Sequence, residues 1–239
     1  MNNCIEVTNL TKTINGRTIV DQLTFSVRRG QVFGLLGPNG AGKTTTIECL
    51  LGIKPHSGEA LLFGKSARTQ RKNIFQKIGV QLQASSYQNT IRVAELCEEL
   101  SVLYEQPKDF RELLRVFHLD QYEKQPVAAL SGGERQKLSI LLALIPNPEI
   151  IFLDELTTGL DTEARREVWQ ILIALKREGL TIFLTTHYME EAEMLCDHLY
   201  LINKGKPVVQ GSVAEVISAA QDTSLEDAYL RHMEGVTHG

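Results

Sequence analysis

The stretch Gly37–Thr44 constrains this chain more than any other. It reads Gly-Pro-Asn-Gly-Ala-Gly-Lys-Thr and fits the phosphate-binding pattern Gly-x-x-x-x-Gly-Lys-Ser/Thr at every fixed position. An apolar run of strand type precedes it, and helical spacing follows it, so the strand, loop and helix of such a motif are all predicted. The alternative is a glycine-rich turn beside a surface lysine, which arises by chance in on the order of one chain in a hundred of this length. The pattern therefore predicts a P-loop that holds a nucleoside triphosphate.

Each residue type in this loop has a task. Glycines let backbone N–H groups approach phosphate oxygens, and the positive end of the following helix points at them. Lys43 adds a mobile cation for the terminal phosphates, and the Thr44 hydroxyl is an expected Mg²⁺ ligand. The residues expected to bind nucleotide here are Gly37, Pro38, Asn39, Gly40, Ala41, Gly42, Lys43, Thr44 and Thr45.

The composition favours one compact cytoplasmic domain without direct contact to nucleic acid. The chain has 239 residues, enough to bury a core without disulfides, and its 25 basic against 29 acidic residues include no basic arm. Its cysteines are scattered without a Cys-x-x-Cys pair, which is typical of reduced cytosolic thiols that serve in packing. The first residues lack a signal-peptide pattern, and no stretch approaches about 18 uninterrupted apolar residues. We therefore expect that the chain itself does not enter a membrane.

Hydrophobic periodicity divides the chain into a core and a helical insert. The first strands alternate apolar and polar residues around a turn at Gly16, which predicts an antiparallel N-terminal part. After further short strands at 59–63 and from residue 78, helical spacing dominates the section 83–148. The expected fold class is α/β in a single domain over 1–239, with the nucleotide-binding core in 1–82 and 149–239 and the insert in 83–148.

The segment 130–136, Leu-Ser-Gly-Gly-Glu-Arg-Gln, has two interpretations. Ser131 and Glu134 have the spacing of a capping box, so they could simply begin the helix that follows. Capping, however, does not require Gly132 and Gly133 in the first turn, where a glycine costs about 1 kcal/mol relative to alanine. Close approach of a ligand to bare backbone N–H groups does require glycine. We therefore expect Ser131, Gly132 and Gly133 to contact nucleotide.

The run 149–155, Glu-Ile-Ile-Phe-Leu-Asp-Glu, has the form of a buried parallel strand that ends in two carboxylates. Open α/β sheets bind ligands at this carboxyl edge. Asp154 is expected to meet Mg²⁺ through a water, and Glu155 to accept a proton from the water that attacks the terminal phosphate. Helix capping or plain solvation of an acidic pair is the alternative.

In this order, the P-loop, the segment 130–136 and the strand that ends at Glu155 resemble the ATP-binding subunits of ABC transporters. The Leu-Ser-Gly-Gly signature is very specific, and the resemblance covers essentially the whole chain. It implies a P-loop NTPase of ABC type, with a mixed sheet core, an N-terminal antiparallel β subdomain and a helical insert. It also implies ATP hydrolysis with Mg²⁺ as cofactor.

Further residues acquire roles from the same resemblance. Gln83 matches the Q-loop glutamine, a Mg²⁺ ligand and sensor of the membrane partner. His187 matches the switch histidine that contacts the terminal phosphate, although a histidine at a strand end is usually structural. The segment 159–161, Gly-Leu-Asp, matches the D-loop, which crosses the dimer interface in this family.

The resemblance also implies partners. Subunits of this kind dimerise around two Mg-ATP molecules, each held between Lys43 of one copy and Ser131 of the other. They drive a separately encoded membrane permease from its cytoplasmic face, either as homodimers or as pairs with a related ATPase. The segments 184–192 and 224–230 look most like the ATPases of two-component type-2 exporters.

The chain departs from the family pattern at three positions. Ile14 stands where an aromatic residue commonly stacks on adenine, so we expect the base to be held mainly by weak apolar contact. Leu156 and Thr162 stand where prolines are frequent, and we expect little effect on the chemistry.

Two other classes of ABC-type ATPase share the signature but act away from membranes. Those that act on DNA insert a very long coiled coil, for which the interval from Thr44 to Ser131 is too short and lacks sustained heptads. Those that act on the ribosome normally carry two cassettes, whereas this sequence contains one P-loop. Transport is therefore the favoured function, and a soluble ATPase on ribosome or DNA is the alternative.

Overall fold

The computed structural model describes residues 3–82 and 90–235, which form two β-sheets with helices around them. The smaller sheet is antiparallel, in the order β2-β1-β4, and consists of β1 (Asn3–Ile14), β2 (Arg17–Arg28) and β4 (Ser57–Leu62). Asn15 and Gly16 connect the first two strands with φ of 48° and 76°, the pair of positive values that a type I′ turn requires. The antiparallel N-terminal part expected from the sequence is confirmed.

The larger sheet has six strands in the order β5-β6-β7-β3-β8-β9. Each pair from β5 to β8 is parallel, whereas β9 runs antiparallel to β8 at the edge. The strands are β3 (Val32–Leu36), β5 (Ile78–Gln81), β6 (Ile150–Asp154), β7 (Thr181–Thr186), β8 (His198–Asn203) and β9 (Lys206–Gly211). The sheet is therefore mixed, as expected.

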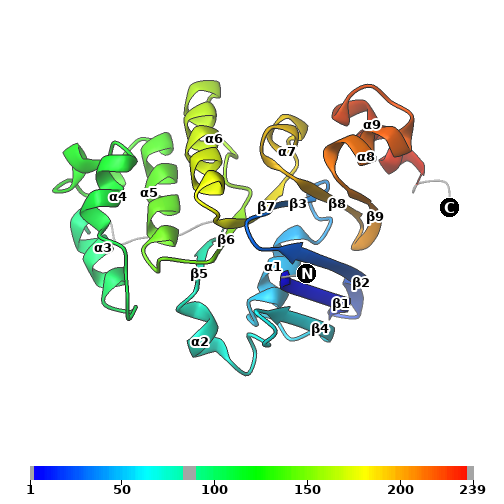
Figure 1. Ribbon diagram of the computed structural model, residues 1–239, viewed down its shortest axis with the longest axis horizontal. Coiled ribbons are helices and arrows are strands. Elements are labelled where there is room, and N and C mark those ends of the chain that lie inside the picture. The colour runs from blue at the N-terminus through cyan, green and yellow to red at the C-terminus, as the bar shows by residue number, and fades with distance from the viewer. Residues whose placement is uncertain (1–2, 83–89, 236–239) are drawn as a thin grey trace.

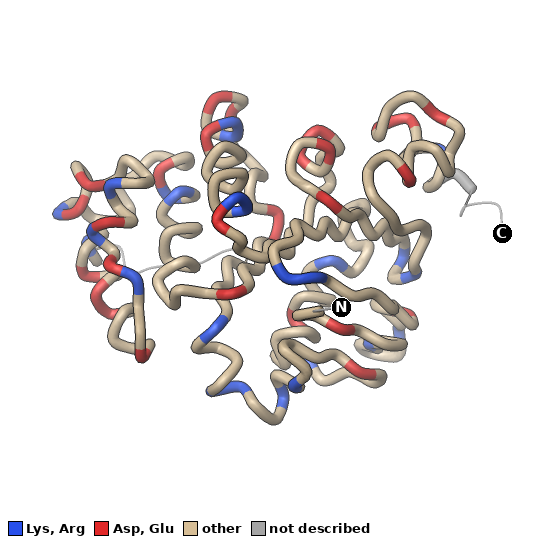
Figure 2. The backbone as a smooth tube through the Cα atoms, viewed as in Figure 1, with Lys and Arg blue, Asp and Glu red and all other residues tan. Residues whose placement is uncertain are grey.

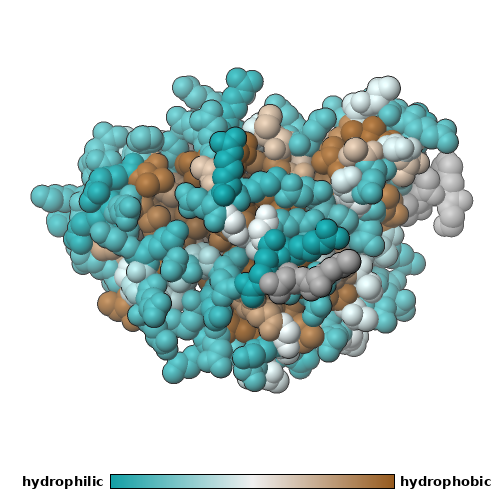
Figure 3. Space-filling model, viewed as in Figure 1, coloured by the Kyte–Doolittle hydropathy of each residue, from teal (hydrophilic) through white to brown (hydrophobic). Residues whose placement is uncertain are grey.

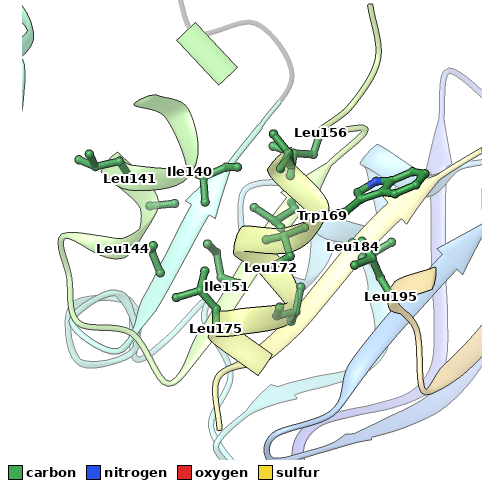
Figure 4. Close-up of a cluster of buried hydrophobic side chains, with 14 of the residues drawn as sticks. Ile140, Leu141, Leu144, Ile151, Leu156, Trp169, Leu172, Leu175, Leu184 and Leu195 are labelled. Atoms are coloured by element: carbon green, nitrogen blue, oxygen red, sulfur yellow. The ribbon is translucent and has the colours of Figure 1, made fainter. Parts of the chain in front are cut away.

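Both faces of the larger sheet are covered, because successive side chains of a strand point to opposite faces. On β6, the side chains of Ile151 and Leu153 belong to a hydrophobic cluster with buried side chains of three helices. These helices are α5 (Gly132–Leu144), α6 (Thr162–Arg177) and α7 (Met189–Leu195). Figure 4 shows this helical side of the core. Ile150 and Phe152 instead pack with the antiparallel sheet and α1 (Lys43–Leu50). The central strands β3, β6 and β7 are therefore buried at every position.

Most of the remaining helices lie at the two ends of the larger sheet (Figure 1). The insert adds α3 (Val93–Ser101), α4 (Phe110–Val116) and the 3₁₀ turns η1 (Asp120–Tyr122) and η2 (Val127–Ala129) beyond β5. Beyond β9 lie α8 (Val213–Ala220) and α9 (Leu225–Gly235), and α2 (Arg71–Phe75) precedes β5. The fold class is the expected one, and the division at residues 83 and 148 stays a prediction.

The surface is charged with both signs. Figure 2 shows acidic and basic residues interspersed along the helices, and Figure 3 shows a mostly hydrophilic face with small hydrophobic patches, one of them over α8 and α9. Within the described ranges, no helix combines the length and the apolar character needed to cross a bilayer.

Candidate nucleotide-binding site

The P-loop connects β3 to α1, and close approach of two backbones explains its first and last glycines. A Cβ on Gly37 would lie 2.4 Å from the carbonyl oxygen of Ile202 on β8. Gly42 has φ of 105°, and a Cβ there would lie 2.7 Å from the carbonyl oxygen of Ile19 on β2. Any larger residue would push these strands away, so the loop geometry depends on glycine at both positions.

The Lys43 side chain folds back across the loop that precedes it. It is 4% exposed, and Nζ donates hydrogen bonds to the carbonyl oxygens of Gly37 at 2.8 Å and Pro38 at 3.2 Å. Nζ also lies 3.0 Å from Oε1 of Glu155, whose side chain is 12% exposed. The ammonium is thus held at the point where the loop meets the end of β6.

A cavity of about 300 Å³ opens over this loop. Its lining combines P-loop residues with one residue of β2 and one that follows β6: Ile19, Asn39, Gly40, Gly42, Lys43, Thr44, Thr45 and Glu155. Ala41 is buried, and its N–H donates to the carbonyl oxygen of Pro38 at 3.1 Å, so these two residues shape the loop. Backbone N–H groups and a cation at a helix N-terminus form a site suited to phosphate.

Asp154, the last residue of β6, is fully buried and joins three neighbouring elements. Its Oδ2 accepts from the Thr44 hydroxyl at 2.7 Å, and its Oδ1 accepts from the Thr185 hydroxyl at 2.5 Å. Its backbone N–H donates to Oε1 of Gln81 at 3.2 Å. Hydroxyl and carboxylate oxygens converge here, and these are the ligands that Mg²⁺ prefers, so the residues fit this ion.

Glu155 follows with φ of 48°, a left-handed conformation that is strained for a residue with a Cβ. Its N–H is held by the carbonyl and the hydroxyl oxygens of Thr185, each at 3.1 Å. Nδ1 of His187 lies 3.6 Å from Oε1 of Glu155. The structure therefore brings Lys43, Glu155 and His187 together, because β6 and β7 end side by side at the P-loop.

Two glutamines of this region differ in what the structure describes. Gln83 lies outside the described residues, so its expected roles stay predictions. Gln81, which the sequence alone would place as a solvated residue at a strand end, instead accepts a hydrogen bond from the backbone N–H of Asp154. The only sign of this contact in the sequence is that Gln81 is a polar residue at the end of a strand, between two apolar neighbours.

The signature segment lies at a second cavity, of about 440 Å³. Ser131 caps α5: its hydroxyl accepts from the Glu134 N–H at 3.3 Å, and its own N–H donates to Glu134 at 2.7 Å. Hydrogen bonds from the Tyr122 hydroxyl and from Ser131 lower the pKa of Glu134. The structure therefore contains the capping box that the spacing predicted. A capping box alone does not explain why glycine occupies positions 132 and 133.

In the part of the chain that the structure describes, no close contact with neighbouring backbone requires glycine at position 132 or 133. A Cβ on Gly132 would meet nothing within 4 Å, and one on Gly133 would lie 3.2 Å from the Ala164 side chain. The second cavity also contains the expected D-loop: Gly159, Leu160 and Asp161 line it, and Asp161 caps α6 by accepting from the Ala164 N–H at 2.9 Å. Signature and D-loop therefore share one surface.

Ile14, the residue expected to contact adenine, is not among the residues that line the cavity over the P-loop. Ile14 pairs with Arg17 at the β1–β2 turn and is partly exposed. Of the two isoleucines, Ile19 is the one that lines the cavity over the P-loop. Neither side chain can stack on a base as an aromatic ring does.

Comparison of the chain with known proteins shows the family to which it is related. The family model described as ABC transporter matches residues 20–158. Nod factor export ATP-binding protein I of Ralstonia nicotianae is 42% identical over 231 residues, which cover 94% of this chain and 72% of the relative. The protein of the same name from Cupriavidus metallidurans is 36% identical over 240 residues, which cover 96% of this chain and 78% of the relative.

Solved structures agree on the fold. An ATP-binding subunit of an ABC transporter has a TM-score of 0.87 at 24% identity, covering 96% of this chain and 99% of that one. The ADP conformation of an ATP-binding cassette of an ABC transporter has a TM-score of 0.82 at 23% identity, with the same coverage of both chains. The chain therefore belongs to the ABC transporter family, and it is an ATP-binding subunit of that family with ATPase activity.

Proposed function

We propose that two ATPase subunits, either two copies of this chain or this chain and a related one, close around two ATP molecules, each bound between the P-loop of one subunit and the signature of the other. The observation that carries this proposal is the separation of the two cavities. Among the described residues, the cavity over Lys43 and the cavity at Ser131 have no lining residue in common. In a pair of subunits, one nucleotide can lie between the P-loop cavity of one copy and the signature cavity of the other.

The reaction is in-line attack of water on the γ-phosphate, which breaks the bond to the bridging oxygen of the β-phosphate and releases ADP and phosphate. Glu155 accepts the proton of the attacking water, and Lys43 neutralises charge on the phosphate oxygens. His187, beside Glu155, contacts the terminal phosphate. Most of the catalysis is positioning, because the phosphoryl group needs little covalent help from the protein.

Thr44, Asp154 and Gln83 are the residues that would hold Mg²⁺. The hydrogen bond of 2.7 Å between the Thr44 hydroxyl and the Asp154 carboxylate supports this assignment, because it brings two oxygen ligands together. When bound, the ion neutralises negative charge on the phosphate oxygens. Thr185 keeps the Asp154 carboxylate oriented from the other side.

Hydrolysis drives a separate membrane permease, to which the subunit binds at the cytoplasmic face of the membrane. The relatives from Ralstonia nicotianae and Cupriavidus metallidurans are named for Nod factor export, and this supports an exporter.

The decisive experiment uses Glu155→Gln, which keeps the shape of the side chain but cannot accept the proton. With Mg-ATP, the variant should bind nucleotide, lose turnover and accumulate as a dimer in size-exclusion chromatography. Adding Lys43→Ala to the same variant should return it to the monomer. A strictly monomeric Glu155→Gln variant, or turnover near that of the wild type, would contradict the proposal.

A second experiment tests the partner. A tagged copy extracted in detergent should purify together with an integral membrane protein, and the pair should show ATP-dependent transport in vesicles. Recovery with ribosomes or DNA instead would favour the class of ABC-type ATPases that act away from membranes.

A further inference from the structure

Glu191 on α7 is a buried carboxylate that none of the proposed chemical steps uses. Its side chain is 2% exposed. Burial raises its pKa, and hydrogen bonds from Thr186, Thr157 and Trp169 act in the opposite direction. A carboxylate in such surroundings costs free energy of folding unless its oxygens are hydrogen-bonded, so its partners are informative.

Two donors from different elements meet at one oxygen of this carboxylate. The Thr157 hydroxyl donates to Oε1 at 2.9 Å, and the indole N–H of Trp169 donates to the same atom at 3.2 Å. Thr157 is fully buried, and Trp169 lies on α6 in the same hydrophobic cluster as Leu184 and Leu195 (Figure 4). The carboxylate therefore ties α7 to α6 and to the segment between β6 and α6.

That segment contains the proposed base Glu155 and the expected D-loop. It begins with Glu155 and ends with Asp161, and it is folded into turns by N–H groups of Thr158 and Leu160, which donate to the carbonyl oxygens of Glu155 and Thr157 at 3.2 Å each. The Thr157 side chain is the point where this folded segment is attached to α7.

The other end of the connection is the loop that carries His187. This residue lies between β7 and α7, shortly before Glu191 in the first turn of α7. The loop is held locally, because the N–H of Tyr188 donates to the Thr186 hydroxyl at 3.0 Å. A displacement of α7 would therefore move His187 relative to Glu155, unless Glu191 held the two segments together.

We infer that Glu191 is a positioning residue for ATP hydrolysis: through Thr157 it keeps the segment from Glu155 to Asp161 in place relative to His187. The inference rests on the roles proposed above for Glu155 and His187. Glu191 touches neither nucleotide nor attacking water, and its effect is on the geometry of the groups that do. The hydrogen bond from Trp169 anchors the same carboxylate to α6, which is a packing task.

The two donors provide a matched pair of variants. Both positions are buried, and Thr157→Val and Trp169→Phe each remove one hydrogen bond to Oε1 of Glu191. Thr157→Val keeps the side-chain volume, whereas Trp169→Phe also removes one ring and leaves a cavity, which makes it the more severe test of a general loss of stability. Thr157→Val should lower kcat about tenfold or more, because misplacement of catalytic groups by a fraction of an ångström is costly, and it should leave KM and the Kd for ATP within about twofold. Trp169→Phe should leave kcat within about twofold and lower only Tm. Thr157→Ser keeps the hydroxyl and should restore kcat.

Three outcomes would overturn the inference. In the first, Thr157→Val has the kcat of the wild type. In the second, Thr157→Val and Trp169→Phe lower kcat and Tm alike, as a general loss of stability would. In the third, Thr157→Ser is as slow as Thr157→Val. Glu155→Gln, measured in the same assay, distinguishes failure of the proposed function from failure of this inference. If Glu155→Gln turns over normally, the proposed role of Glu155 as base is wrong. If Glu155→Gln is inactive and Thr157→Val has normal activity, only the positioning role of Glu191 is rejected.

Discussion

Lys43 and Glu155 form an ion pair inside the nucleotide cavity, with 3.0 Å between Nζ and Oε1 and both side chains largely buried. Because breaking a buried pair leaves the other charge uncompensated, Glu155→Gln should lower the free energy of unfolding by about 1–3 kcal/mol. The phosphates of a nucleotide supply replacement charge. The increase in Tm caused by a non-hydrolysable ATP analogue should therefore be larger in this variant than in the wild type.

Scanning fluorimetry with and without the analogue measures both quantities. Glu59→Gln, at an exposed position on β4, is the control and should behave as the wild type. Equal increases in Tm for the wild type and Glu155→Gln would show that the nucleotide does not engage the charge of Lys43.

Lys43→Ala should weaken ATP binding more than ADP binding. The side chain reaches past the loop carbonyls to Glu155, where the terminal phosphate is expected, so ADP makes less use of it. Loss of a charge-assisted hydrogen bond of about 1.5–3 kcal/mol corresponds to an affinity for ATP that is about 10- to 100-fold lower. Calorimetric titration with both nucleotides measures this, with Lys54→Ala as the control. Equal losses for ATP and ADP would place Lys43 away from the γ-phosphate.

Gly132→Ala should make the subunit more stable and less active. A Cβ at this position meets nothing within 4 Å, and alanine is favoured over glycine in a helix by up to about 1 kcal/mol, which raises Tm by about 2–4 °C. ATPase activity should fall, because the methyl group stands where the nucleotide approaches the backbone. Gly133→Ala, which would crowd Ala164, should gain less stability. Unchanged turnover in Gly132→Ala would favour a purely capping role for this segment.

Discrimination between ATP and GTP should be weak, within about tenfold. Ile19, which lines the cavity, and Ile14, where the family places an aromatic residue, are both aliphatic, so the phosphates dominate binding. Ile14→Tyr should raise ATP affinity about 3- to 10-fold, since an aromatic contact is worth about 0.5–1.5 kcal/mol. Competition binding with labelled ATP tests both statements. A strong preference of the wild type for ATP, or no gain in the variant, would place the base elsewhere.

The thiols should be unreactive in the folded protein. All four cysteines are buried and free, and burial raises the pKa of Cys49 to about 11 and that of Cys97 to about 12. Only the thiolate reacts with a disulfide reagent, so Ellman's reagent at pH 8 should label the native chain slowly and all cysteines after denaturation. Rapid labelling of the native protein would show that a cysteine is accessible.

The sequence by itself determined those features of the protein that depend only on residues close together in the chain. The P-loop, the capping box at Ser131 and the strand that ends in Asp154 and Glu155 are short motifs whose backbone needs can be read locally. The strand and helix periods were likewise sufficient for the fold class, because buried parallel strands are apolar throughout. These motifs together were also specific enough to indicate the family.

Only the tertiary structure decided which of these parts meet. The strand order β5-β6-β7-β3 brings Lys43, Glu155 and His187 to one point, although they are far apart in the sequence. The signature is held at a separate cavity. The contact of Thr157 with Glu191 joins a loop to a helix, and neither residue belongs to a motif that would reveal it. Strand order and such contacts arise from long-range packing of both faces of the sheet, which local periodicity does not encode.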